Sequence, residues 1–169
     1  RLVIRRLKHL SLETPSMKRI IITAAVLVVA ASNAQQAFAH CEVPCGIYAD
    51  QRRFEQMLED QKTIQKAMVS INELAAKSDA LSKNQLTRWV VTKEEHATNT
   101  QHIIAQYFMT QRLKPGSEGY VKKLAAAHAV MVAAMKCKQS VDPATAATLR
   151  SAILDFYRAY EGKEPQIEG

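Results

Sequence analysis

The sequence predicts an all-α protein built as an antiparallel four-helix bundle. Apolar residues recur at helical spacing through almost all of residues 50–161, and glycine is rare, with five among 169 residues. No stretch alternates apolar and polar residues as a half-buried strand would. Four amphipathic helices joined by short connections favour a bundle, which we assign to residues 49–161 as one domain.

The first two predicted helices fill residues 50–113. The first is expected from about Asp50 to Lys77, with Asp50 as its N-cap. Residues 78–82 form a short connection, and the second helix extends over about 83–113, ending before Lys114-Pro115-Gly116. The side chains expected to face the core are Phe54, Met57, Leu58, Ile64, Met68, Ile71 and Ala75 in the first helix, and Leu86, Trp89, Val90, Ala97, Ile103, Ile104, Tyr107 and Phe108 in the second.

The last two predicted helices are marked by a clear start signal. The third covers about 118–139, and the fourth begins where Asp142 serves as N-cap and Pro143 occupies the first helical position. We expect His128 to continue the apolar stripe of the third helix and to be buried, and residues 162–169 to form a polar tail. The core-facing side chains are expected to be Val121, Leu124, Met131 and Met135 in the third helix, and Leu149, Ile153, Phe156 and Tyr160 in the fourth.

Residues 17–39 have the three regions of a secretory signal peptide. A basic start at Met17-Lys18-Arg19 precedes the apolar residues 20–31 and the small-x-small end Ala37-Phe38-Ala39. The apolar run is shorter than the roughly 20 residues of a membrane span. Residues 1–16 are interpreted as an upstream extension, with a longer basic leader as the alternative. We therefore expect cleavage after Ala39 and an exported chain, periplasmic or extracellular, with no membrane segment left.

The positive charge of the chain belongs mainly to this leader. Residues 1–39 carry six of the 23 Lys and Arg residues but only one of the 16 acids, so the net charge falls from +7 to +2 for residues 40–169. No basic patch of the kind that nucleic-acid-binding proteins use then remains, and we expect no nucleic-acid partner.

The segment directly behind the expected cleavage site gathers one imidazole and two thiols, in His40, Cys41 and Cys45. In an oxidising compartment two nearby cysteines are ordinarily read as a disulfide. Such a bridge would close only a tight loop and would stabilise little. Composition therefore leaves two alternatives open, a disulfide and a metal site. The third cysteine, Cys137, is left over as a buried helical residue or a surface one.

A chain that begins at His40 offers a compact set of nitrogen and sulfur donors. Its amine nitrogen, the Cys41 amide nitrogen and the Cys41 sulfur are linked through adjacent five-membered chelate rings. Pro44 and Gly46 are suitable turn formers that let Cys45 supply a fourth corner, and the imidazole can approach from above the plane. A tetragonal set of this kind suits nickel, and its anionic donors stabilise a higher oxidation state of the metal.

The pattern His40-Cys41-x-x-Pro44-Cys45-Gly46-x-Tyr48 resembles the nickel hook of the nickel superoxide dismutases. The resemblance implies a hook over residues 40–48 on a four-helix-bundle subunit, one nickel ion per subunit and a homohexamer. It implies a superoxide dismutase that converts superoxide into dioxygen and hydrogen peroxide by cycling between Ni(III) and Ni(II). A metal carrier and a disulfide-bonded interaction module are the rival functions.

The resemblance also assigns roles to individual residues. His40, Cys41 and Cys45 would be the nickel ligands, and Tyr48 would stand over the open axial face and help to admit superoxide. Arg53-Phe54-Glu55 resembles a family pattern whose glutamate orients the axial imidazole, so Glu55 is the expected acceptor. The arginine that backs this glutamate in the family has no clear match, and His96 stands in its place. Lys114 lies in a segment similar to a Tyr-Phe-Lys-Pro stretch of the family, with an insertion, and would attract the anion.

Overall fold

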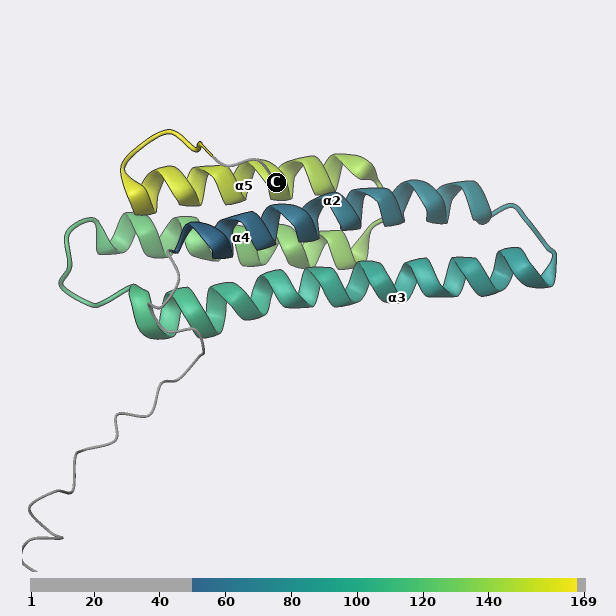
Figure 1. The fold of residues 1–169 in the computed structure, drawn as a ribbon, viewed down its shortest axis with the longest axis horizontal. Coiled ribbons are helices and arrows are strands. Elements are labelled where there is room, and N and C mark those ends of the chain that lie inside the picture. The colour runs from purple at the N-terminus through teal and green to yellow at the C-terminus, as the bar shows by residue number, and fades with distance from the viewer. Residues whose placement is uncertain (1–49, 167–169) are drawn as a thin grey trace, which may run out of the picture. The chain divides into compact units, whose positions relative to one another are not determined.

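The computed structural model is described over residues 50–166, and all of the regular structure in that range is helical. The elements are α2 (Gln51–Leu74), α3 (Ala80–His102), η1 (Ile103–Arg112), α4 (Tyr120–Gln139) and α5 (Pro143–Glu161). Because η1 continues α3 without a break, the two form one long rod, and the described chain is a bundle of four helices (Figure 1). The predicted helical bundle is confirmed, whereas the predicted hook lies outside the described residues.

Each helix packs against the two that adjoin it around the bundle. Helix α2 contacts α3 and α5, and α4 contacts α3 and α5. With successive helices antiparallel, this is up-and-down connectivity. The start of α2, the end of η1, the start of α4 and the end of α5 therefore meet at one end of the bundle, which we call the Asp50 end (Figure 1).

At the opposite end, the α2–α3 hairpin extends beyond the turn between α4 and α5 (Figure 1). Two contacts mark where that turn meets the hairpin: Asn72 Nδ2 donates to the carbonyl of Val141 at 3.0 Å, and Lys93 Nζ donates to the carbonyl of Cys137 at 2.8 Å. We call residues 73–92, which lie beyond these contacts, the hairpin tip. None of residues 72–92 is buried.

The starts of α3 and α5 follow capping rules, whereas the start of α2 does not. Asp142 caps α5 as predicted. Its side chain accepts a hydrogen bond from the amide of Ala144 at 2.9 Å, and Pro143 occupies the first helical position. Asp79 caps α3 in the same way through the amide of Ser82, so this helix begins three residues earlier than expected. Asp50 occupies the N-cap position of α2, as predicted, but its side chain makes no capping hydrogen bond. That carboxylate is bound elsewhere.

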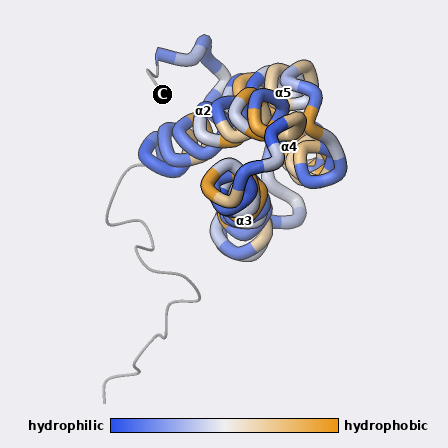
Figure 2. Tube along the Cα trace, turned by 90° about the vertical axis from the view of Figure 1, so that its right-hand side faces the viewer, coloured by the Kyte–Doolittle hydropathy of each residue, from blue (hydrophilic) through white to orange (hydrophobic). Residues whose placement is uncertain are grey.

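The buried faces agree with the predicted stripes in α2, in α5 and in the second half of the α3–η1 rod, although Ala75 and Val90 are exposed and Tyr160 is only partly buried. The stripe predicted for α4 is right only in part. Met131 packs against the core and Leu124 is partly buried, but Val121 is 76% exposed, Met135 is 40% exposed and His128 is also exposed. Small residues instead form the inner face of α4, and they let its backbone approach its neighbours closely. They are Ala127, Val130, Ala133, Ala134 and Cys137. Each helix carries hydrophobic and hydrophilic positions, as Figure 2 shows.

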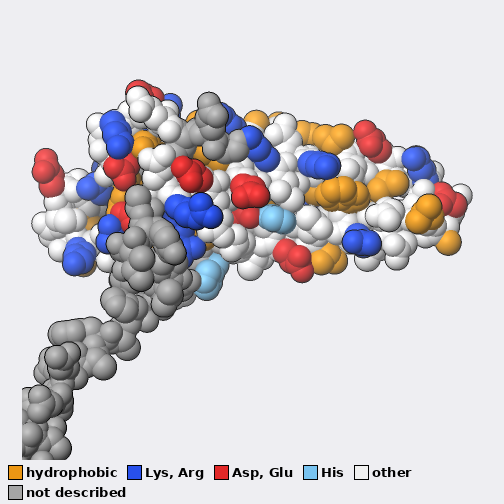
Figure 3. Space-filling model, in the orientation of Figure 1, with side chains coloured by type: hydrophobic (Ala, Val, Ile, Leu, Met, Phe, Trp, Pro, Cys, Tyr) orange, Lys and Arg blue, Asp and Glu red, His pale blue; other side chains and the backbone are white. Residues whose placement is uncertain are grey.

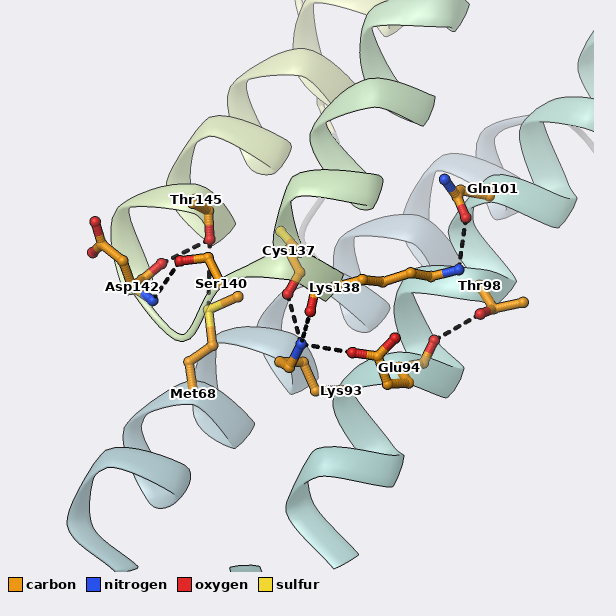
Figure 4. A network of polar contacts seen from close by, with 10 residues as sticks. All are labelled: Met68, Lys93, Glu94, Thr98, Gln101, Cys137, Lys138, Ser140, Asp142 and Thr145. Carbon is orange, nitrogen blue, oxygen red and sulfur yellow. Dashed lines mark hydrogen bonds and ion pairs between the residues drawn. The ribbon is translucent and has the colours of Figure 1, made fainter. Parts of the chain in front are cut away.

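A buried lysine joins α3 to the end of α4. Lys93 is 3% exposed, and its ammonium group donates to the carbonyls of Cys137 and Lys138 at 2.8 and 2.7 Å and to Glu94 at 2.8 Å (Figure 4). The last carbonyls of a helix have no partner within the helix, and they lie at the negative end of its dipole. The Lys93 ammonium group donates hydrogen bonds to two of these carbonyls and places a positive charge at the negative end of the dipole. The nearby Lys138 donates to Gln101 on α3 at 2.8 Å and reinforces the joint.

The rod changes its winding over its last ten residues, where η1 is a π-helix. Its hydrogen bonds span five residues, as in the bond from the amide of Leu113 to the carbonyl of Phe108 at 2.8 Å. This winding brings Tyr107 and Phe108 into the core at the Asp50 end. No helix within residues 50–166 is both long and apolar enough to span a membrane.

Candidate metal centre and the Asp50 end

The predicted nickel ligands His40, Cys41 and Cys45, together with Tyr48, lie outside the described residues. The described chain begins two residues after Tyr48, at Asp50, where the predicted hook joins the bundle. Within residues 50–166, no group of three or more His, Cys, Asp and Glu side chains could hold a metal ion. What the structure shows of the candidate centre is therefore the surface to which its ligand-bearing segment is attached.

The Asp50 carboxylate is the centre of a polar network that joins three elements. It accepts hydrogen bonds from the hydroxyl groups of Tyr107 on η1 and Tyr160 on α5, the latter at 2.5 Å. Arg112 at the end of η1 donates to it through Nη2 at 2.6 Å and Nε at 3.1 Å. The Asp50 side chain is only 9% exposed. A buried carboxylate with this many donors is held firmly in its ionised form.

The π-helical winding of η1 explains why Tyr107 and Arg112 reach the same carboxylate. Residues five apart lie on different faces of an α-helix but close to one face of a π-helix, whose hydrogen bonds connect residues five apart. Sequence reasoning assumed α-helical spacing and therefore missed Arg112 as a partner of the buried residue Tyr107.

The network shifts the proton affinities of its members in directions that keep it intact at neutral pH. Burial alone would raise the pKa of Asp50, but hydrogen bonds from Tyr107, Tyr160 and Arg112, with the guanidinium charge, hold that pKa below its ordinary 3.8. Burial and the hydrogen bond to the Asp50 carboxylate raise the pKa of Tyr107 to about 12. The same two causes raise the pKa of Tyr160. Both phenols therefore remain donors.

Aromatic rings and cations surround this network. The ring of Phe54 lies 4.9 Å from that of Phe108 and 5.2 Å from that of Phe156, and Phe108 lies 5.2 Å from Tyr160. The Arg53 guanidinium lies 4.9 Å from the centre of the Tyr107 ring. The rings give the Asp50 end a rigid base, since such aromatic pairs stabilise beyond their buried area.

Lys123 and Lys114 add to the positive charge of the Asp50 end. The Lys123 ammonium lies 5.8 Å from the centre of the Tyr160 ring, within the range of a cation–π contact. Lys114, one of the sequence candidates, is an exposed residue two positions after the end of η1. With Arg53 and Arg112, these residues form a group of cations beside an anchored carboxylate.

The structure places the candidate Glu55 on α2, where it accepts from Gln51 Nε2 at 3.2 Å. His96 pairs with a different residue, its Nδ1 lying 2.7 Å from Asp60 Oδ1. The two acids are five residues apart on an α-helix, so they point to different faces of α2. His96 is thus bound to Asp60.

Asp60 is the buried acid that sequence reasoning missed. It is 4% exposed and also accepts from Asn99 at 2.7 Å and from Thr100 at 3.4 Å. Burial raises the pKa of Asp60 above 3.8, although the hydrogen bonds from His96, Asn99 and Thr100 oppose that rise. One signal was available, because Asp60 lies between Met57 and Ile64 on the apolar stripe of α2. A charged residue at such a position needs buried partners.

Comparison with known proteins gives one match. The model of a family described as nickel-containing superoxide dismutase matches residues 35–164. That match covers the predicted hook and all of the helices described above. No curated protein and no solved structure matches the chain.

Proposed function

The chain belongs to the family of nickel-containing superoxide dismutases, and from this premise we propose that His40, Cys41 and Cys45 hold its nickel ion. The enzyme converts superoxide into dioxygen and hydrogen peroxide, and the nickel supplies one-electron chemistry between Ni(III) and Ni(II). The observation that carries the ligand assignment is the donor set: an imidazole and two thiols lie in six residues directly behind Ala37-Phe38-Ala39. Nitrogen and sulfur donors of these types suit nickel.

Each of the three ligand residues would contribute at least one donor atom to the metal. His40 would offer its amine and imidazole nitrogens, Cys41 its amide nitrogen and thiolate, and Cys45 a second thiolate. Thiolate and amide donors are strongly electron-donating, which favours the oxidised form of a bound metal. Position 42 is Glu where the family more often has Asp, which keeps the negative charge and lengthens the side chain.

The residues around the metal would admit and attract the substrate. Tyr48 would help to admit superoxide, and Glu55 would accept a hydrogen bond from the His40 imidazole, as in the family pattern. What supports the place of Glu55 is its position on the first turns of α2, one turn beyond Asp50. The cations of the Asp50 end, Arg53 and Lys114 among them, would attract the superoxide anion and raise its rate of encounter.

We also propose that the enzyme works as a homo-oligomer, and the family resemblance makes this a hexamer. Several large apolar side chains are exposed on the described surface, with Leu81, Val90 and Val91 on the hairpin tip at 69%, 39% and 47% exposure. Apolar side chains are visible over this part of the surface in Figure 3. Contiguous exposed apolar surface is typical of subunit contacts. We assign the hairpin tip to such contacts.

Export is the third part of the proposal. Cleavage after Ala39 would release an enzyme with His40 at its amino terminus in the periplasm or the extracellular space. The charged, apolar and small-residue regions of residues 17–39 support it. An intact mass of the secreted protein that corresponds to a start at His40 is the expected result, and a start at any other residue would contradict it.

The experiment that tests the ligand assignment compares two chains loaded with nickel. One begins at His40 and the other retains Ala39, which converts the amine donor into a second amide. We expect rapid catalysed decay of superoxide with the first chain only. A Cys45→Ser variant of the first chain is the control, and it should lose nickel and activity together.

Two results would overturn the assignment. Equal activity of both chains would show that the amine of His40 is not a ligand. Stoichiometric nickel without catalysis in the chain that begins at His40 would point instead to a nickel carrier.

A further inference from the structure

The Asp50 carboxylate accepts hydrogen bonds from side chains that lie far away along the chain. Its partners Tyr107, Arg112 and Tyr160 lie 57, 62 and 110 residues away along the chain. The carboxylate is not used to start α2, because it makes no capping hydrogen bond and the backbone of Asp50 is already helical. We call these four residues the Asp50 clamp. The clamp fixes the point at which the chain enters the bundle.

The hydrophobic core does not need this clamp to fill its space. Phe54 is fully buried one turn further along α2 and already packs against Phe108, Phe156 and Tyr157. A buried carboxylate is costly unless its donors compensate for lost water, so an apolar residue at position 50 would be the simpler way to stabilise the same helix end. The clamp therefore specifies position at this point of the chain.

The position that it fixes is close to the predicted metal ligands along the chain. Asp50 is the fifth residue after Cys45. A fully extended chain spans at most about 3.6 Å per residue, so Cys45 can lie no farther than about 18 Å from Asp50. Tyr48, two residues away, can lie no farther than about 7 Å from it. Whatever holds Asp50 in place thus limits where the metal-binding segment can go.

We propose that Asp50, held by Arg112 and Tyr160, is a positioning residue that fixes the start of α2, from which the nickel-binding segment departs, and thereby slows the release of the metal. This inference rests on the proposed function, because it requires that His40, Cys41 and Cys45 be the ligands. A ligand segment that is ordered before binding loses less conformational freedom when the metal binds. Residues that support metal ligands without contacting the metal typically change metal affinity by about 10- to 100-fold.

The test uses the full nickel-loaded chain that begins at His40 and two matched substitutions. Asp50→Ala removes the centre of the clamp. Asp142→Ala removes an aspartate that caps α5 at the other end of the bundle, through its bond to the amide of Ala144. Both variants lose stability, but only the first touches the clamp. Tyr160→Phe is a milder third variant, since it deletes one donor to Asp50 and keeps the ring that packs on Phe108.

Two properties of each variant are measured besides activity. The first is the rate at which a chelator removes nickel, and the second is the electron paramagnetic resonance spectrum of the oxidised metal. We expect Asp50→Ala to release nickel at least about tenfold faster with an altered spectrum, and Tyr160→Phe to show a smaller change in the same direction. Asp142→Ala should stay within about twofold of the unsubstituted chain, with the same spectrum.

The proposal is overturned if all variants release nickel at the unsubstituted rate, or if Asp142→Ala accelerates release as much as Asp50→Ala does. The second result would mean that general stability of the bundle governs release. If Asp50→Ala does not fold, Tyr160→Phe decides by the same criterion. Failure of the proposed ligand set would be recognised separately, because the unsubstituted chain beginning at His40 would then take up no nickel.

Discussion

At the Asp50 end, rings from α2, η1 and α5 pack against one another under a carboxylate that three side chains hold. At the hairpin tip, by contrast, no residue from 72 to 92 is buried, and Leu81 is 69% exposed. Both regions include residues of α2 and of the rod that α3 and η1 form. The difference teaches that this bundle concentrates rigidity where the predicted metal segment joins it and leaves apolar surface at the other end.

The sharpest test of this contrast compares one apolar residue from each region. Phe108→Ala should lower the free energy of unfolding by about 3–5 kcal/mol, the usual cost of deleting a buried aromatic ring. Leu86→Ala at the hairpin tip should cost about 1 kcal/mol or less, since Leu86 is only partly buried. Urea unfolding of both variants measures this. Similar losses would contradict the contrast between the two ends.

The boundary between the two regions is set by Lys93, and it should be the next most sensitive position. Lys93→Met leaves the carbonyls of Cys137 and Lys138 without their donor. Buried acceptors left unpaired cost about 1–3 kcal/mol. Lys138→Met is the matched control, because it removes a partly buried bond to Gln101 and should cost less than about 1 kcal/mol. An equal loss of stability in both variants would show that the buried Lys93 stabilises the protein no more than the partly buried Lys138 does.

The apolar surface of the hairpin tip predicts a change in assembly. Val91→Glu should weaken subunit association by at least about tenfold, or about 1.4 kcal/mol. Analytical ultracentrifugation across a range of concentrations would detect it as smaller species. The control is Val121→Glu at the Asp50 end, where a more exposed valine is replaced by the same charge. If Val91→Glu leaves the assembly unchanged, the hairpin tip does not form subunit contacts.

Acid should act on two buried aspartates with opposite signs. The folded-state pKa of Asp50 lies below 3.8, so its contribution to stability is present above about pH 4 and is lost as pH falls through the folded value. The pKa of Asp60 lies above 3.8, so its contribution declines as pH rises through that window. Between about pH 5 and pH 2, the stability of Asp50→Asn should therefore fall less steeply than that of the unsubstituted chain, and the stability of Asp60→Asn more steeply.

Thermal unfolding measured at each pH distinguishes these slopes. If the two variants have parallel slopes, the clamp does not hold Asp50 in its charged form.

The smallest expected effect concerns the charge of the Asp50 end. Lys114→Gln should lower kcat/KM for superoxide by about twofold and weaken its dependence on salt, because long-range attraction is screened. Lys77→Gln, which removes another exposed charge, on the hairpin tip, should change neither quantity. Pulse radiolysis at several ionic strengths provides the measurement. An unchanged salt dependence in Lys114→Gln would exclude Lys114 from steering.

The sequence alone determined the helices, the cap at Asp142, the faces of α2 and α5, and the motif that indicates nickel chemistry. These features depend on residues near one another in the chain, where periodicity, capping and chelate rings are decided by covalent spacing. The family match over residues 35–164 agrees with that motif.

Only the tertiary structure decided what the charged residues inside the bundle do. Asp50 has the sequence of an N-cap, yet Tyr107, Arg112 and Tyr160 bind it from elements that lie far along the chain. The inner face of α4 is built from small residues, and the π-helical winding of η1 places Arg112 beside Asp50. A polar group buried by folding must bind whichever partners the fold brings near it, and local spacing does not specify them.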